Sequence, residues 1–204
     1  SFLGLEAHGL LAGLLPETAA ALASNRSGAL RRMLLEGLRA TDARIAADEP
    51  VSPAFLFALL LWPAYCRTLA MLQAQGMHVA EAERRAADRV TLHQVATVAL
   101  PRRFSLPMQE VWLLQARFSQ RQRKRVVRLL SHPRFRAAYD FLLLRQSASD
   151  SHAEDIAFWA EAQRDPDHAL EVAALTVESE GDGASTESRG PRRRRRRRPA
   201  AVGH

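Results

Sequence analysis

The sequence contains little cysteine, little lysine and few aromatic residues. Its 204 residues include one cysteine, Cys66, which excludes an intrachain disulfide and any metal site built from several thiolates. A chain without a cysteine pair is typical of a reducing compartment, so we expect a cytoplasmic protein. Hydrophobic residues still make up 47% of the chain, which is enough for at least one core.

Long hydrophobic runs are also missing. The longest, Ala54 to Trp62, has nine residues and ends at Pro63, whereas a membrane-spanning helix needs roughly 20. The amino end has no basic segment followed by an apolar one, as a secretory signal would. We therefore expect a soluble protein with no membrane partner. Because the first residue is Ser1 rather than methionine, we also expect a fragment of a longer chain.

Positive charge is distributed unevenly. The formal net charge is +7, but eight arginines lie between Ser188 and His204, and the rest of the chain has a net charge of −1. Within that rest, the segment from Arg102 to Arg145 holds eleven basic and two acidic residues, a net charge of +9. A local positive field of this kind attracts polyanions, so a nucleic acid is the expected partner.

Apolar residues recur at helical spacing along most of the chain, and no segment alternates as a strand would. Ser52 followed by Pro53 is a helix-start signal, because the hydroxyl can cap a free amide and proline has none to lose. Short connections between helices favour antiparallel hairpins. The expected fold is all-α, with a multi-helix antiparallel bundle-like body followed by a disordered basic tail. The main expected helices are 29–46, 53–75, 79–100, 106–118, 119–130, 133–146 and 154–163.

The distribution of apolar and basic residues along the chain predicts that it has three regions. Residues 1–100 form a helical body, and residues 101–164 form an arginine-rich helical region. Residues 165–204 have few apolar side chains to bury, so we expect a disordered tail with a polyarginine run.

The predicted helix from Gln120 to Leu130 has one cationic face. At 100° per residue, four of its basic residues fall within one stripe, and Val126, Val127, Leu129 and Leu130 take the other side. A merely solvated face usually alternates in sign, whereas this stripe contains no acid. Fixed cations at helical spacing are typical of phosphate-backbone binding. With basic residues from the neighbouring segments, the predicted phosphate contacts here are Arg117, Arg121, Lys124, Arg125, Arg128, Arg134 and Arg136.

Seven consecutive arginines form a second candidate site for phosphate groups. Adjacent cations repel one another and gain by condensing on phosphates, although a solubilising tail is an alternative. The tail has no aromatic side chain on which a base could stack, so no base-specific readout is expected from it. The predicted contacts are Arg192, Arg193, Arg194, Arg195, Arg196, Arg197 and Arg198.

No catalytic constellation is visible in the sequence. Asp165 and Asp167 have the spacing of a metal-binding pair, but Pro166 lies between them at the end of the last expected helix, so we reject a metal site. The histidines show no i,i+3 or i,i+4 pairing, and glycine-rich phosphate loops are absent. Cys66 has no nearby histidine base, which favours a small buried side chain.

The segment VWLLQARFSQRQRKRVVRLLSHPRFRAAYDFLLLR, which begins at Val111, resembles the carboxy-terminal part of bacterial poly(A) polymerases. The block HPRFRAAYD is the most specific part of the resemblance, and VSPAFLFALLLWP from Val51 and PRRF from Pro101 also match. The resemblance implies the RNA-binding body and arginine-rich tail of a polynucleotide adenylyltransferase. It also implies that Phe135, Tyr139 and Phe141 are core residues and that Asp140 pairs with an arginine.

The family adds AMP from ATP to RNA 3′ ends in mRNA processing, with paired metal-binding carboxylates in a nucleotidyltransferase head. That head is absent from this sequence, so we expect no cofactor here, and ATP and Mg²⁺ are implied only for the parent enzyme. The resemblance also implies an RNA helicase as a partner. Two alternatives stay open, the helical body of a CCA-adding tRNA nucleotidyltransferase and a protein-interaction scaffold.

Overall fold

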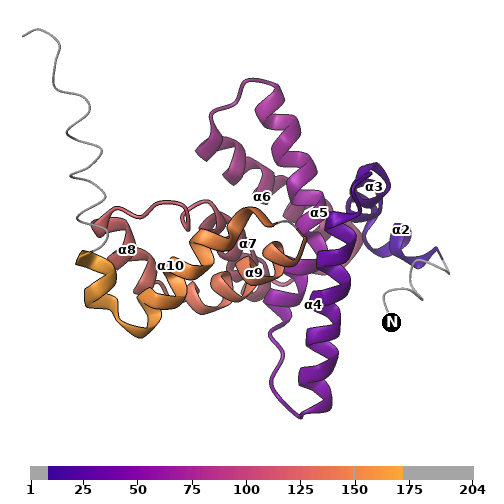
Figure 1. Cartoon of the computed structure of the whole chain (residues 1–204). Helices are drawn as coiled ribbons and strands as arrows, with labels where there is room; N and C mark the ends of the chain where they lie inside the picture. The colour runs from indigo at the N-terminus through magenta and orange to yellow at the C-terminus, as the bar shows by residue number, and fades with distance from the viewer. Residues whose placement is uncertain (1–8, 149, 172–204) are drawn as a thin grey trace, which may run out of the picture.

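The computed structural model describes residues 9–148 and 150–171, and these are helical with no strand. The all-α fold is therefore confirmed (Figure 1). The helices are α2 (Leu10–Leu14), α3 (Pro16–Ser24), α4 (Ala29–Ala46), α5 (Pro53–Ala74), α6 (Val79–Thr97), α7 (Arg102–Gln115), α8 (Arg123–Leu130), α9 (Phe135–Ala148) and α10 (Ala153–Arg164), with a 3-10 turn η1 (Asp150–His152) before α10.

Helix α5 is the central element and packs against α3, α4, α6 and α7. Ser52 caps it as predicted, because its Oγ accepts from the backbone amide of Phe55 at 3.4 Å. Pro63 lies inside the helix, which runs on to Ala74 without a break. By length and composition alone α5 could cross a membrane, but half of its most apolar window is buried inside the protein, as in a core helix.

The first hydrophobic core surrounds α5. The Tyr65 ring stacks on Trp62 and Trp112, with ring centroids 5.1 and 4.9 Å apart. The indole N–H of Trp112 donates to the carbonyl of Ala58 at 3.0 Å, which fixes α7 against α5. Helix α4 comes so close to α5 that a Cβ at Gly37 would collide with the Leu59 side chain. The bundle is therefore tightly packed where these helices meet.

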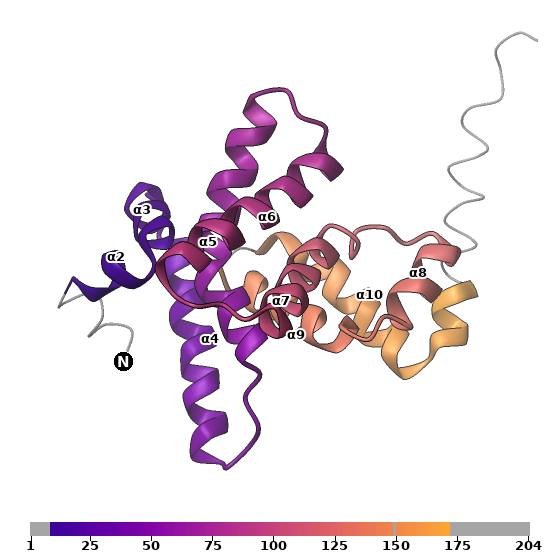
Figure 2. The ribbon, with the colours of Figure 1, turned by 180° about the vertical axis from the view of Figure 1, so that it is seen from behind.

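A second core joins α8, α9, α10 and the end of α7. Figures 1 and 2 show this part extending to one side of the α5–α6 hairpin. Trp159 is fully buried, and its indole N–H donates to the carbonyl of Phe118 at 2.7 Å. Phe135, Tyr139 and Phe141 are buried, as the resemblance implied. The chain is helical again over residues 166–171, where Ala169 is buried in this core, so helix continues past the predicted start of the tail.

Two predictions for the basic segment are wrong. The helix expected from Ser119 begins at Arg123, and the Ser119 hydroxyl donates to the carbonyl of Ala116 at 3.2 Å. Helix α7 begins at Arg102, four residues before the expected start. Residues 116–122 therefore form a connection that carries Arg117 and Arg121 outside α8.

Candidate nucleic-acid interface

Helix α8 is positioned by two buried side chains. Val126 and Leu129 are 0% and 2% exposed and pack in the second core with Phe118 and Trp159. Val127, which was predicted to share this face, is 49% exposed. With the apolar side of α8 fixed in the core, its basic side chains extend toward solvent.

Beside α8 lies a cavity of about 330 Å³ lined by Arg117, Gln120, Arg125, Arg128 and Leu129. The three arginines are exposed, and no acidic residue lines the cavity. Within the described part of the chain, none of these arginines forms an ion pair. The connection and the helix thus supply cations that converge on one hollow. Guanidinium groups present several N–H donors in a planar fork, which suits phosphate oxygens.

Two further basic residues of α8 lie outside the lining of this cavity. Lys124 is exposed on α8, as predicted, although it does not line the cavity. Arg123 is exposed in the first turn of α8, and the stripe predicted from the sequence omits it because it lies off the cationic face. Gln120 was also missed, because nothing in the local sequence shows that the connection folds beside the helix. We call Arg117, Gln120, Lys124, Arg125 and Arg128 the basic surface.

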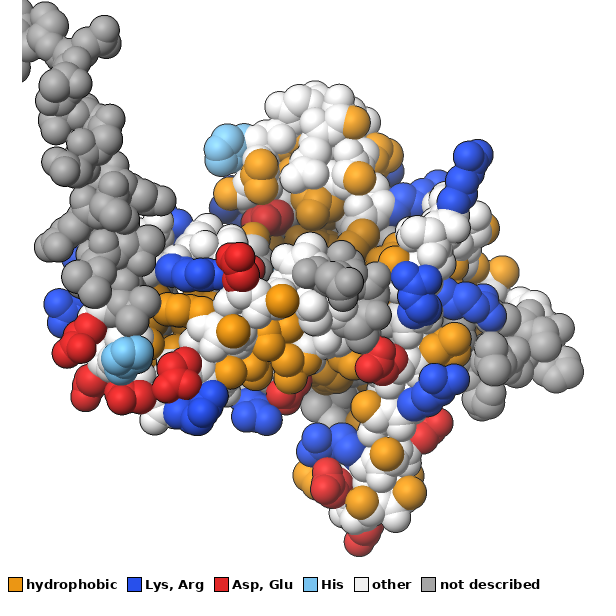
Figure 3. Space-filling view, in the orientation of Figure 1, with side chains coloured by type: hydrophobic (Ala, Val, Ile, Leu, Met, Phe, Trp, Pro, Cys, Tyr) orange, Lys and Arg blue, Asp and Glu red, His pale blue; other side chains and the backbone are white. Residues whose placement is uncertain are grey.

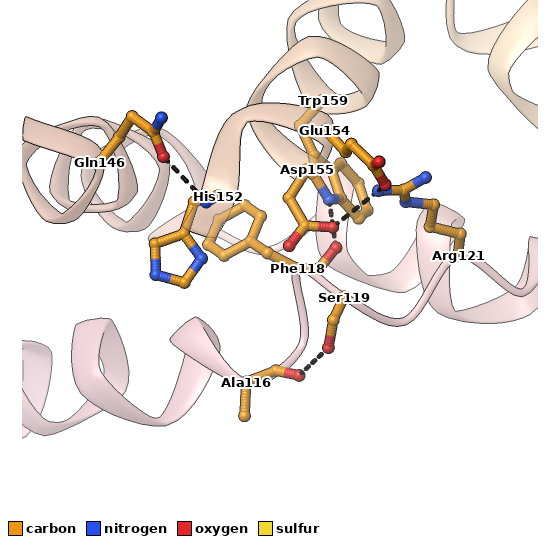
Figure 4. A network of polar contacts seen from close by, with 9 residues as sticks. All are labelled: Ala116, Phe118, Ser119, Arg121, Gln146, His152, Glu154, Asp155 and Trp159. Atoms are coloured by element: carbon orange, nitrogen blue, oxygen red, sulfur yellow. Dashed lines mark hydrogen bonds and ion pairs between the residues drawn. The ribbon is translucent and has the colours of Figure 1, made fainter. Parts of the chain in front are cut away.

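Arg121 does not line the cavity beside α8, and its side chain lies against the start of α10 instead (Figure 4). Its Nη2 lies 2.9 Å from Oδ1 of Asp155 and 3.9 Å from Glu154, at the start of α10. The guanidinium also covers the Phe158 ring, 5.3 Å from its centroid. The prediction that Arg121 shares the cationic face of α8 is wrong, because α10 holds this side chain against the second core.

Arg134 and Arg136 also have acidic neighbours. Arg134 Nε lies 3.2 Å from Oε2 of Glu110, and Arg136 Nε lies 3.1 Å from Oδ1 of Asp140. Both arginines are exposed, so these are surface pairs of small energetic weight that a phosphate could replace. Asp140 therefore pairs with an arginine, as the resemblance implied.

The remaining candidates lie elsewhere. Arg192 to Arg198 fall outside the described residues. Asp165 and Asp167 are exposed beyond the end of α10, where Figure 3 shows acidic side chains gathered. In the described residues, no group of three or more His, Cys, Asp or Glu side chains could hold a metal ion.

Comparisons with known proteins give a consistent result. The family model described as "Polymerase A arginine-rich C-terminus" matches residues 75–199. Poly(A) polymerase I of Salmonella typhi is 33% identical over 202 residues, which are 97% of this chain and 43% of that protein. Poly(A) polymerase I of Escherichia coli O157:H7 is 37% identical over 133 residues, which are 65% of this chain and 29% of that protein. The chain thus spans less than half the length of these relatives.

Proposed function

The chain belongs to the polymerase A arginine-rich C-terminus family, and from this premise we propose that it holds RNA for 3′-end polyadenylation by a poly(A) polymerase. The basic surface beside α8 binds phosphates of a single strand, and Arg192 to Arg198 add a second phosphate-binding segment. The nucleotidyltransferase head that uses ATP and Mg²⁺ lies outside this chain. The cytoplasmic location and the RNA-helicase partner stay predictions.

The observation that carries this proposal is the convergence of Arg117, Arg125 and Arg128 on one cavity without an acidic residue. Three cations that lie around one cavity with no carboxylate in its lining raise the local potential, and binding a polyanion relieves their mutual repulsion. Their number also makes RNA binding salt-dependent, because each neutralised phosphate releases counterions. Nothing in this arrangement distinguishes one RNA sequence from another, since phosphates carry no base identity.

A salt series with single-stranded RNA tests the proposal. In one variant of the 204-residue chain, Arg117, Lys124, Arg125 and Arg128 become glutamine. In the charge-matched control, the exposed residues Arg26, Arg39, Arg84 and Arg89 become glutamine. Both variants lose four positive charges, so any difference in RNA affinity between them depends on where the substituted residues lie. We expect the first variant to bind more weakly, and its log–log salt slope to fall by about 0.7 for each phosphate that it no longer neutralises.

The control should keep most of the affinity and slope. Equal losses in the two variants would mean that only net charge matters and would refute the basic surface as the RNA site. A third variant, with Arg192 to Arg198 changed to glutamine, measures the contribution of the polyarginine run. Its effect should add to that of the first variant, because the two segments contact different phosphates.

A further inference from the structure

A second cavity, of about 340 Å³, lies between α5, α6, α7, α9 and the start of α10. It opens where the two hydrophobic cores meet, with Trp62, Tyr65 and Trp112 from the first core and Leu142 from the second in its walls. Its volume is at the lower end of the range for small-molecule sites. Such a space suits a ligand no larger than one nucleoside.

Arg145 is the polar centre of this cavity. Its guanidinium lies over the Trp62 ring, 5.3 Å from the ring centroid, and Nη1 donates to Oε1 of Gln115 at 3.2 Å. The amide nitrogen of Gln115 donates to the carbonyls of Val111 and Ala138, so the residue that orients Arg145 is itself fixed. Within the described residues Arg145 forms no ion pair. Burial lowers the pKa of Arg145, as expected of a cation held in an apolar wall.

The other polar groups of the cavity supply both donors and acceptors of hydrogen bonds. Ser119 and His152 line the cavity, and burial, followed by the charge of Arg145, lowers the pKa of His152. The imidazole is therefore neutral at neutral pH, with one donor and one acceptor nitrogen. Glu83 and Asp155 also line the cavity and offer acceptor oxygens.

This mixture of groups disfavours an anion as the ligand. One guanidinium faces the same space as two carboxylates, so the cavity has no excess of positive charge to hold a phosphate. A nucleobase is a better match, because its edge carries donors and acceptors while its faces are apolar. The Arg145 guanidinium is held over Trp62, and bases stack on guanidinium planes as they do on aromatic rings.

The position of the cavity relative to the basic surface supports the same ligand. Ala116 and Ser119 line this cavity, whereas their neighbours Arg117 and Gln120 line the cavity beside α8. Residues 116–120 therefore contribute side chains to both cavities.

We propose that the cavity around Arg145 binds one unpaired nucleobase of the RNA strand whose backbone lies on the basic surface. The proposal rests on the proposed function, since the strand must first bind. It differs in kind from phosphate binding, because it requires the base to be present. Arg145 supplies the stacking plane, and Ser119 and His152 contact the base edge.

The test compares a single-stranded RNA 12-mer with an abasic oligomer of the same ribose-phosphate length, both measured by fluorescence anisotropy. We expect the 204-residue chain to bind the intact RNA roughly tenfold more tightly. Arg145→Gln should remove this preference and leave binding to the abasic oligomer unchanged. Ser119→Trp should do the same by filling the cavity from its rim, and it keeps the proposal testable if Arg145→Gln does not fold. The control, Arg39→Gln, should keep the preference.

The outcomes separate this proposal from the proposed function. Tight binding of both oligomers with equal affinity would overturn the base pocket and leave phosphate binding intact. A base preference that survives both Arg145→Gln and Ser119→Trp would place the base elsewhere and would also overturn it. Failure to bind either oligomer would overturn both proposals.

Discussion

Arg121 and Arg125 are four residues apart and carry the same charge, but their surroundings differ. The Arg121 side chain is 34% exposed and contacts Asp155, whose side chain is 17% exposed. Arg125, in contrast, is exposed and lines the cavity beside α8. A partly buried, hydrogen-bonded ion pair is worth more than a surface pair, because fewer water molecules screen it. Arg121 therefore stabilises the attachment of α10, while Arg125 is available to a ligand.

The change Arg121→Gln should lower the free energy of unfolding by about 1–2 kcal/mol, because it leaves Asp155 without its cation. Arg125→Gln should stay within about 0.5 kcal/mol of the wild type, as exposed substitutions usually do. Urea denaturation followed by circular dichroism measures both values. Equal stability of the two variants would contradict the role given to Arg121.

His152 predicts a pH dependence of stability. Its pKa in the folded protein is below the usual 6.5, so the unfolded chain binds a proton more readily as the pH falls. Neutral His152 therefore makes its full contribution to the free energy of unfolding above about pH 6.5. This contribution is lost as the pH falls through the pKa of His152 in the folded protein. We expect His152→Gln to flatten the pH dependence of the thermal midpoint below about pH 6.5. A wild-type profile no steeper than that of the variant would show that burial does not act on this imidazole.

At the scale of the element, α8 depends on one narrow apolar face. Val126 is fully buried, whereas the next residue, Val127, is 49% exposed. Val126→Asp places a charge in the second core, and we expect it to lower the unfolding free energy by several kcal/mol. Val127→Asp is the matched control and should have little effect on stability. Chemical denaturation of both variants gives the comparison, and similar losses would mean that α8 does not pack through this face.

The accuracy of the sequence-based predictions also depends on the element. Helix α4 runs over Ala29–Ala46 as expected, because its apolar stripe and the glycine before it are local signals. The start of α8 was misplaced, and in the connection before it Arg121 pairs with Asp155, 34 residues further along the chain. Contacts at that separation leave no trace in local periodicity. The cavity around Arg145 could not be predicted for the same reason, since its walls come from residues 62 to 155.

At the scale of the whole molecule, the two cores meet around the cavity that contains Arg145. The first core is organised by α5, and the second presents the basic surface through α8. The +9 segment from Arg102 to Arg145 therefore becomes a localised field rather than a general property of the protein. Its cations do not act alike, however, because Arg121 is paired within the fold and Arg145 lines a cavity of its own.

The central claim is that RNA lies along the basic surface beside α8. Photo-crosslinking of the 204-residue chain to a single-stranded RNA containing 4-thiouridine, with the attached peptides identified by mass spectrometry, tests it most directly. We predict that cross-links concentrate on peptides covering residues 116–130 and disappear from them when Arg117, Arg125 and Arg128 are changed to glutamine. Cross-links confined to the α5–α6 hairpin or to Arg192 to Arg198, with none in residues 116–130, would contradict the account.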